Sequence, residues 1–254
     1  MREVHIGKKK IKIYDSIEEL PMNRFHKYNK MLLIDSGLGS DLSDFDRHIS
    51  RAAAFLKEGK TEQAIIEMEN MRQNIYNIQS GIDPKMLAFA CLVAEIEGKA
   101  VTDISDDALR ALAEEFGDIT KKDLTDTMES VKKKIDEELV TYFPKIFESS
   151  ELKEAWDKVK ARTVLVLESI IKKESKTAQI EKIDRELLTY TKPKKFSGKD
   201  NAEVEYDKQF ERLSLSIRQN LNADTGGMTV LQFYSACEYI ADMLKAREKT
   251  QKRK

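Results

Sequence analysis

The chain has 254 residues, 35% of them charged, and its 44 lysines and arginines nearly balance its 45 aspartates and glutamates, giving a net charge of −1. This balance excludes a wholly basic nucleic-acid-binding surface and the high net charge that is typical of disordered chains. With 41% hydrophobic residues, the chain can bury the core of one large domain or of two smaller ones.

Residues that carry out catalysis or bind metals are few and scattered. None of the histidines and cysteines has the spacing of a metal site or a catalytic motif. Cys91 and Cys237 lie in apolar helical patterns, so we expect reduced core residues, and we expect His26 and His48 to be structural or on the surface. We therefore predict no enzyme, no cofactor and no metal. A catalytic site, if present, would lie between the two histidines and the acids of 41–46.

The first 37 residues predict a small β-hairpin followed by a helix. Residues 4–6 and 11–14 alternate like strands, and an isolated hairpin is only marginally stable, so it must dock on helices of its own chain or on a neighbouring subunit. Pro21 suits a first helical position, and Gly37 suits a helix stop. The Gly37-Leu38-Gly39 sequence lacks the third glycine of a dinucleotide loop and follows a helix, which favours a turn.

Four helical patterns fill the rest of the first half, over residues 41–59, 61–81, 85–97 and 105–117. The first two are amphipathic, and we expect their apolar stripes to point inward. These stripes are Leu42, Phe45, Ile49, Ala52, Ala53 and Leu56 in the first helix, and Ile65, Met68, Ile75 and Ile78 in the second. The pattern over 85–97 is apolar around much of its circumference, so we predict the central helix of the first domain.

The second half predicts longer helices. Residues 120–142 have apolar side chains at alternating steps of four and three, and Pro144 marks a break. Residues 151–190 contain neither proline nor glycine, and one helix of that length would extend about 60 Å. The pattern fits a projecting helical hairpin, an intersubunit coiled coil, or a long bundle helix kinked near 172–177.

Residues 191–202 are polar and contain Pro193 and Gly198, so they predict a linker before two last helices, over 206–221 and 229–244. The fold class is therefore mainly α: a helical bundle with a short N-terminal β-hairpin and a long helix or helical hairpin in the second half. We predict three parts: 1–117, a hairpin plus helical domain; 118–190, the long-helix region; and 191–254, a linker and helical pair.

Two groups of residues are candidates for contact with partners. The predicted interface residues are large apolar or aromatic side chains on helices: Trp156, Val159, Val166, Ile170, Phe233 and Tyr234. The last ten residues hold six basic groups, which predict either a solvated helix end or a contact to nucleic acid or an acidic partner. These six are Lys245, Arg247, Lys249, Lys252, Arg253 and Lys254.

Three sequence stretches resemble a known group of proteins. They are Ile-Lys-Ile-Tyr-Asp-Ser-Ile-Glu-Glu-Leu-Pro at 11–21, Leu-Ile-Asp-Ser-Gly-Leu-Gly-Ser-Asp at 33–41, and 83–93, which reads Asp-Pro-Lys-Met-Leu-Ala-Phe-Ala-Cys-Leu-Val. Over residues 10–116, and more weakly over 228–244, the chain resembles uncharacterised proteins of tailed phages of gut Bacteroidetes, including crAss-like phages.

The resemblance implies a virion or virion-assembly protein, made in the cytoplasm of the bacterial host, with no catalytic residue to carry over. We expect a head-to-tail connector, tail ring or adaptor subunit. Its partners would be further copies of the chain and portal or tail components, with a weak DNA contact through the basic tail and no membrane. The alternatives are a tail-assembly chaperone or scaffold that binds a virion protein transiently and a nucleic-acid-associated protein.

Overall fold

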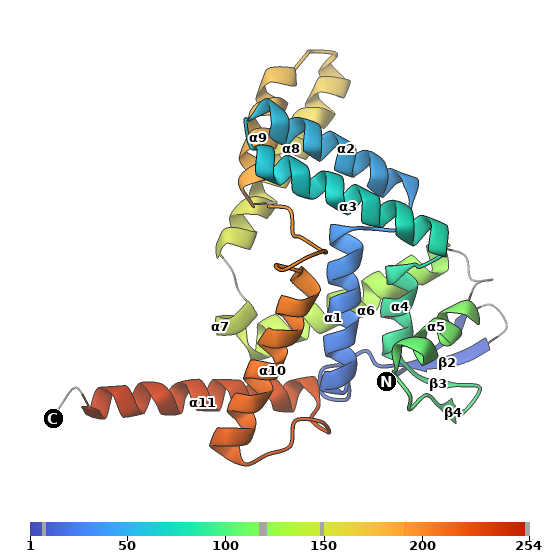
Figure 1. Cartoon of the computed structure of the whole chain (residues 1–254), viewed down its shortest axis with the longest axis vertical. Coiled ribbons are helices and arrows are strands. Elements are labelled where there is room, and N and C mark those ends of the chain that lie inside the picture. Colours follow the sequence, from blue (N-terminus) through green and yellow to red (C-terminus); the bar gives the residue numbers. More distant parts are fainter. Residues whose placement is uncertain (7–8, 117–120, 148–149, 191, 252–254) are drawn as a thin grey trace.

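The structure, a computed structural model, describes residues 1–6, 9–116, 121–147, 150–190 and 192–251. The described chain is mainly helical, with one antiparallel sheet in the order β1-β2-β3-β4 (Figure 1). The strands are β1 (Arg2–Ile6), β2 (Lys9–Ile13), β3 (Val93–Ile96) and β4 (Lys99–Ala100). The helices are α1 (Met22–Gly37), α2 (Leu42–Lys57), α3 (Thr61–Ser80), α4 (Pro84–Leu92), α5 (Asp106–Glu114), α6 (Lys121–Tyr142), α7 (Pro144–Phe147), α8 (Ser150–Lys172), α9 (Thr177–Tyr190), α10 (Ala202–Leu221) and α11 (Val230–Gln251). This architecture confirms the predicted fold class.

The N-terminal hairpin docks on a strand of its own chain. Strand β2 pairs with β3, where Ile11 lies opposite Ile96 and Ile13 opposite Val93. The prediction of one helix over 85–97 is therefore wrong, because α4 ends at Leu92 and the next four residues are extended. An apolar run without a clear period fits a buried helix and a buried strand equally well, and here the backbone of β2 selects the strand.

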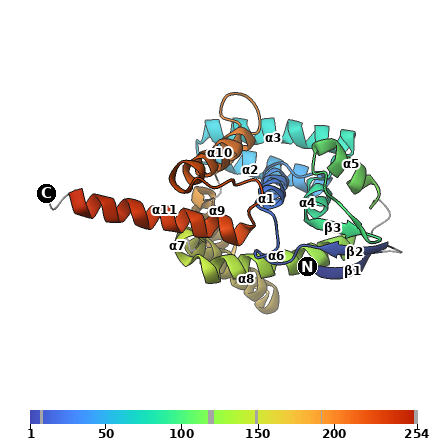
Figure 2. The same ribbon diagram turned by 90° about the horizontal axis from the view of Figure 1, so that it is seen from below.

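Helices α1 and α4 pack together at the centre of the molecule, and α6 and α3 lie on opposite sides of them (Figure 2). Helix α6 buries the predicted stripe of Leu124, Met128, Val131, Ile135 and Leu139, whereas Tyr142 stays 49% exposed. The buried side chains form one cluster from Ile11 to Ile240, which draws residues from all three predicted parts of the chain. The boundaries of those parts stay predictions.

Residues 150–190 form a helical hairpin that projects beyond α2 (Figure 1). The chain turns at Lys173, whose φ is 53°, close to the predicted kink. Ion pairs then join the two helices: Arg162 Nε lies 2.5 Å from Asp184 Oδ1, and Lys158 Nζ lies 2.5 Å from Glu186 Oε2. Of the predicted alternatives, the projecting hairpin is confirmed.

The polar segment 192–201 packs along the body of the molecule. Phe196 is buried against Gly37 at the end of α1, where an added Cβ would lie 2.2 Å from the Phe196 ring. Asn70 of α3 donates a hydrogen bond to the carbonyl of Lys194 over 2.9 Å. The linker thus helps to hold α3 against α1.

Asp35 in the last turn of α1 provides a pH-dependent test of this packing. Its side chain is 18% exposed, and burial raises its pKa to about 6, with Lys85 opposing the shift and the Asp44 and Asp83 charges adding to it. The unfolded chain has the ordinary value of 3.8, so the folded state binds the proton more tightly, and ionisation destabilises it progressively as the pH rises through this range.

We expect Asp35→Asn to stabilise the protein by about 2 kcal/mol above pH 7, because the amide avoids the buried charge at a helix C-terminus. Below about pH 3 the variant and the parent should unfold nearly alike, since Asp35 is then mostly protonated in both states. Urea unfolding at several pH values measures the difference. A gain that is equal at all pH values would contradict this origin.

Candidate interaction site

The α2–α3 hairpin lies across the C-terminal end of α1 (Figure 1). Asp41 caps α2 by accepting hydrogen bonds from the backbone N–H groups of Ser43 (2.9 Å) and Asp44 (3.0 Å). Gly59, with a φ of 70°, lies between the two helices, and Gly81, with a φ of 63°, ends α3. These local signals fix the ends of both helices, and long-range contacts decide which face is buried.

The buried face of the hairpin contains a charged cluster. Glu67 is 1% exposed and accepts from His48 Nδ1 over 2.7 Å, while Arg51 Nε lies 2.8 Å from its other carboxylate oxygen. His48 Nε2 lies 3.0 Å from the carbonyl oxygen of Leu38, which can only accept. Glu67 therefore contacts two basic side chains, and both ring nitrogens of His48 lie within hydrogen-bond distance of buried oxygen atoms.

Three asparagines extend this buried polar layer along α3. Asn74 Nδ2 donates to the carbonyl of Leu38 and Asn77 Nδ2 to that of Gly39, each over 3.0 Å. Asn70 binds the segment 192–201, as described above. The layer therefore satisfies backbone carbonyls that two irregular segments bring to the hairpin, which buried carbonyl groups require.

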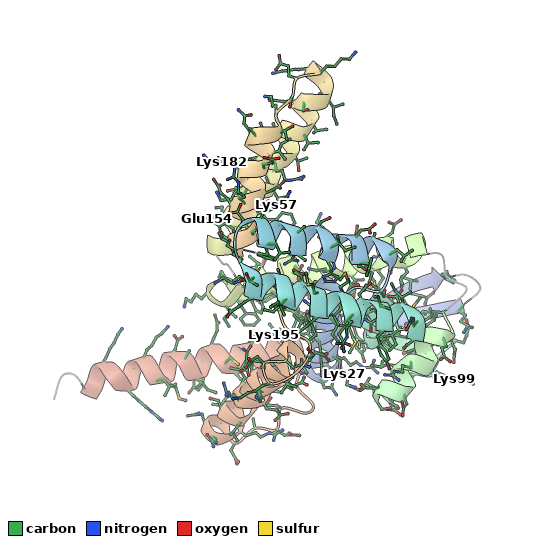
Figure 3. The ribbon with its side chains drawn as sticks, turned by 45° about the horizontal axis from the view of Figure 1, so that its top comes forward. Lys27, Lys57, Lys99, Glu154, Lys182 and Lys195 are labelled. Carbon is green, nitrogen blue, oxygen red and sulfur yellow. The ribbon has the colours of Figure 1, made fainter. Side chains whose placement is uncertain are left out.

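The apolar residues of α2 and α3 consequently face outward, and the prediction that they point inward is wrong for most of them. Ala52 is buried as predicted, but eight large apolar side chains of the hairpin are exposed, with fractions from 36% to 72%. We call them the outer face: Leu42, Ile49, Leu56, Ile65, Met68, Ile75, Tyr76 and Ile78. In Figure 3 α2 and α3 lie in front of the rest of the chain.

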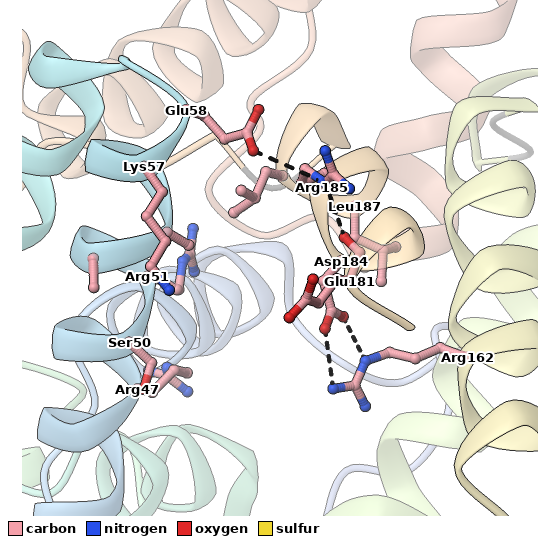
Figure 4. A pocket seen from close by; sticks show the side chains of 13 residues that line it. Arg47, Ser50, Arg51, Lys57, Glu58, Arg162, Glu181, Asp184, Arg185 and Leu187 are labelled. Carbon is pink, nitrogen blue, oxygen red and sulfur yellow. Dashed lines mark hydrogen bonds and ion pairs between the residues drawn. The ribbon is translucent and has the colours of Figure 1, made fainter. Parts of the chain in front are cut away.

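A cleft of about 720 Å³ separates α2 from the α8–α9 hairpin (Figure 4). Arg185 Nε of α9 lies 4.0 Å from Glu58 Oε1 at the end of α2 and so connects the two walls, whereas Arg162 of α8 binds Asp184 of α9 within one wall. Arg51 on the α2 wall binds the buried Glu67. These arginines already have carboxylate partners, so the cleft is a polar contact between two hairpins and does not resemble an anion site.

Helix α8 carries a second exposed apolar surface, which contains the predicted interface residues of this helix. Trp156 is 58% exposed, Val159 37% and Ile170 67%, whereas Val166 is half-buried. The predicted interface residues did not include Ile171 of the same helix, which at 77% is more exposed than any of these four side chains.

The other two predicted interface residues belong to the body of the chain. Phe233 is fully buried, so its prediction as an interface residue is wrong. The half-buried Tyr234 packs edge-on against Phe233 and Phe147 and lines a groove of about 370 Å³ together with Cys237.

Helix α11 extends away from the body of the molecule (Figure 2). Lys245, Arg247 and Lys249 are exposed on its last turns. The other predicted basic residues, Lys252, Arg253 and Lys254, lie outside the described residues.

The histidines and cysteines have structural surroundings. His26 stacks on Tyr206 and Phe210 and pairs with Asp207 over 2.9 Å, and burial lowers its pKa. Burial also raises the pKa of the Cys91 thiol to about 12 and that of Cys237 to about 11, so both are protonated at neutral pH and poor nucleophiles. His26 and His48 thus bind different carboxylates, neither of them in 41–46.

The described part of the chain contains no group of three or more histidine, cysteine, aspartate or glutamate residues that could hold a metal ion. No helix there is both long and apolar enough to cross a membrane.

Comparison with known proteins finds no matching family model, no matching curated protein and no matching solved structure. The candidate site therefore stands on its own geometry: two exposed apolar surfaces on helical hairpins, with a polar cleft between the hairpins.

Proposed function

We propose that this protein is a non-enzymatic structural subunit of a phage particle, acting through protein–protein contacts at the head-to-tail connector or the tail as a ring or adaptor protein. The outer face of α2 and α3 is the observation that supports a contact function. A monomer rarely exposes a contiguous apolar patch larger than a few hundred Å², and larger patches mark surfaces that bind a partner.

The place in a phage particle comes from the resemblance of residues 10–116 and 228–244 to tailed-phage proteins. The neighbours would be further copies of the chain and portal or tail components. The projecting α11, with Lys245, Arg247 and Lys249 on its surface, suits a contact with packaged DNA or an acidic partner.

Mass spectrometry of purified particles tests the proposal. The protein should be present at a stoichiometry that fits a ring or an adaptor. If it is made during infection but is absent from the particles, the structural assignment fails, and a tail-assembly chaperone or scaffold becomes the better explanation.

Truncation after Leu244 should weaken binding to DNA, and an unchanged affinity would rule out the DNA contact.

A further inference from the structure

We propose that the outer face of α2 and α3 binds the same face of a second copy of the chain, with α2 antiparallel to α2 of that copy about a two-fold axis near Ile49. The inference rests on the proposed contact function and adds the identity of one partner, the surface used and the symmetry.

The spacing of the exposed residues on α2 is the first argument. Leu42, Ile49 and Leu56 lie seven residues apart and are 72%, 45% and 49% exposed, and the half-buried Phe45 lies between the first two. Side chains spaced by seven form the seam along which two helices pack. Ile49 is the middle of this stripe, so a two-fold axis there places Leu42 opposite Leu56 of the second copy.

Charge selects the antiparallel orientation. Asp46 in the first half of α2 and Lys57 at its end are both exposed, Lys57 where it also lines the cleft beside α9, and neither has an ion pair in the part of the chain that the structure describes. About an axis at Ile49, antiparallel packing leaves Asp46 and Lys57 of the second copy about 7–8 Å apart along the helices and also opposes the two helix dipoles. Parallel packing would instead place Asp46 beside Asp46 and Lys57 beside Lys57.

The outer face would form the apolar centre of a homodimer interface. Aromatic side chains such as Tyr76 carry roughly 150–250 Å² each, and the aliphatic ones carry less. Eight such side chains, 36% to 72% exposed, therefore present several hundred Å², and polar neighbours would supply the rest of the ~800 Å² that each partner buries in a standard-size interface. Isologous pairing in which each copy uses the same patch is the commonest symmetry of soluble oligomers.

Light scattering and analytical ultracentrifugation of the full chain give the first test. The parent should reach a mass of twice 29.2 kDa as its concentration rises. Ile49→Asp should weaken the dimer by on the order of 100-fold or more, because each copy would bury an unpaired carboxylate at the axis. Ile171→Asp on α8 is the matched control: it introduces the same charge at an exposed isoleucine outside the outer face. Circular dichroism should show both variants folded.

Disulfide cross-linking tests the symmetry in a Cys237→Ser background that retains the buried Cys91. Ile49→Cys should cross-link with itself on oxidation. Leu42→Cys should not, because the two positions would lie about 21 Å apart along the helices, beyond the ~7 Å Cα–Cα limit of a disulfide. A mixture of Leu42→Cys and Leu56→Cys proteins should cross-link to each other.

The outcomes separate this inference from the proposed function. A parent that stays monomeric at all concentrations, with no Ile49→Cys cross-link, overturns the dimer, whereas the particle measurement still decides whether the protein is a virion subunit. Dissociation by Ile171→Asp but not by Ile49→Asp overturns the assignment to α2 and α3. Cross-linking of Leu42→Cys with itself, and not with Leu56→Cys, overturns the antiparallel arrangement.

Discussion

Glu67→Ala is expected to lower the free energy of unfolding by about 3–5 kcal/mol, the usual cost of removing one partner of a buried ion pair. Glu67 is 1% exposed and is the carboxylate partner of both His48 and Arg51. Without it, His48 remains in a buried position beside the Leu38 carbonyl and its Nδ1 loses the carboxylate acceptor. The variant must then leave this buried polar atom without an acceptor or admit water, and either response costs stability.

Urea unfolding at a fixed protein concentration measures this loss, since self-association would otherwise contribute. Glu69→Ala, an exposed glutamate on the same helix, is the matched control and should change stability by less than about 0.5 kcal/mol. A loss below 1 kcal/mol for Glu67→Ala would show that the cluster contributes little to holding the hairpin in place. The outward orientation of the apolar side chains of α2 and α3 would then need another cause.

Local signals in the sequence were enough to predict the ends of most helices. Asp41, Asp83 and Ser105 cap helices as their positions indicate, and Gly81 ends α3 in the left-handed conformation. The stripe of α6 was predicted for the same reason, since periodicity is a property of neighbouring residues, whereas a kink near 172–177 was only one of the open alternatives for residues 151–190.

Contacts between distant segments could not be predicted in this way. The ends of Val93–Ile96 pair with Ile13 and Ile11, which lie 80 and 85 residues earlier, and nothing within the run itself indicates this partner. The inner face of α3 is polar because Asn74 and Asn77 bind the carbonyls of Leu38 and Gly39.

The sequence did contain a signal for this face, because Glu67, Asn70, Asn74 and Asn77 repeat with the same steps of three and four as the apolar residues. Hydrophobicity alone favoured the wrong side of the helix. The candidate site was missed for the same reason, because every residue of the outer face except Tyr76 was assigned to the core. Among the apolar residues that were predicted to make contacts, those of α8 such as Trp156 lie at the surface.

Arg24→Met is expected to lower the free energy of unfolding by about 3 kcal/mol, because it leaves several buried carbonyl groups without a donor. Arg24 is 4% exposed on α1, and its guanidinium donates to the carbonyls of Cys91 (3.2 Å), Val93 (2.9 Å) and Val101. It also lies 5.6 Å from the centre of the Tyr14 ring. One side chain thus joins the helix-to-strand junction after α4 to the central helix.

Two effects oppose each other in this variant. Burial lowers the pKa of Arg24, which shows that the folded state disfavours the charge, and methionine removes that cost while filling similar space. Against this, each orphaned carbonyl costs about 1–3 kcal/mol, and three such groups outweigh the relief.

Arg110→Met, at an exposed arginine of α5, provides the control and should leave the urea midpoint nearly unchanged. Hydrogen exchange then locates the damage: in Arg24→Met the amides of α4 and β3 should lose protection before those of α8 and α9. If Arg24→Met unfolded at the same urea concentration as the parent, the carbonyls would have found other donors. The end of α4 at Leu92 would then depend on the pairing of β2 with β3 alone.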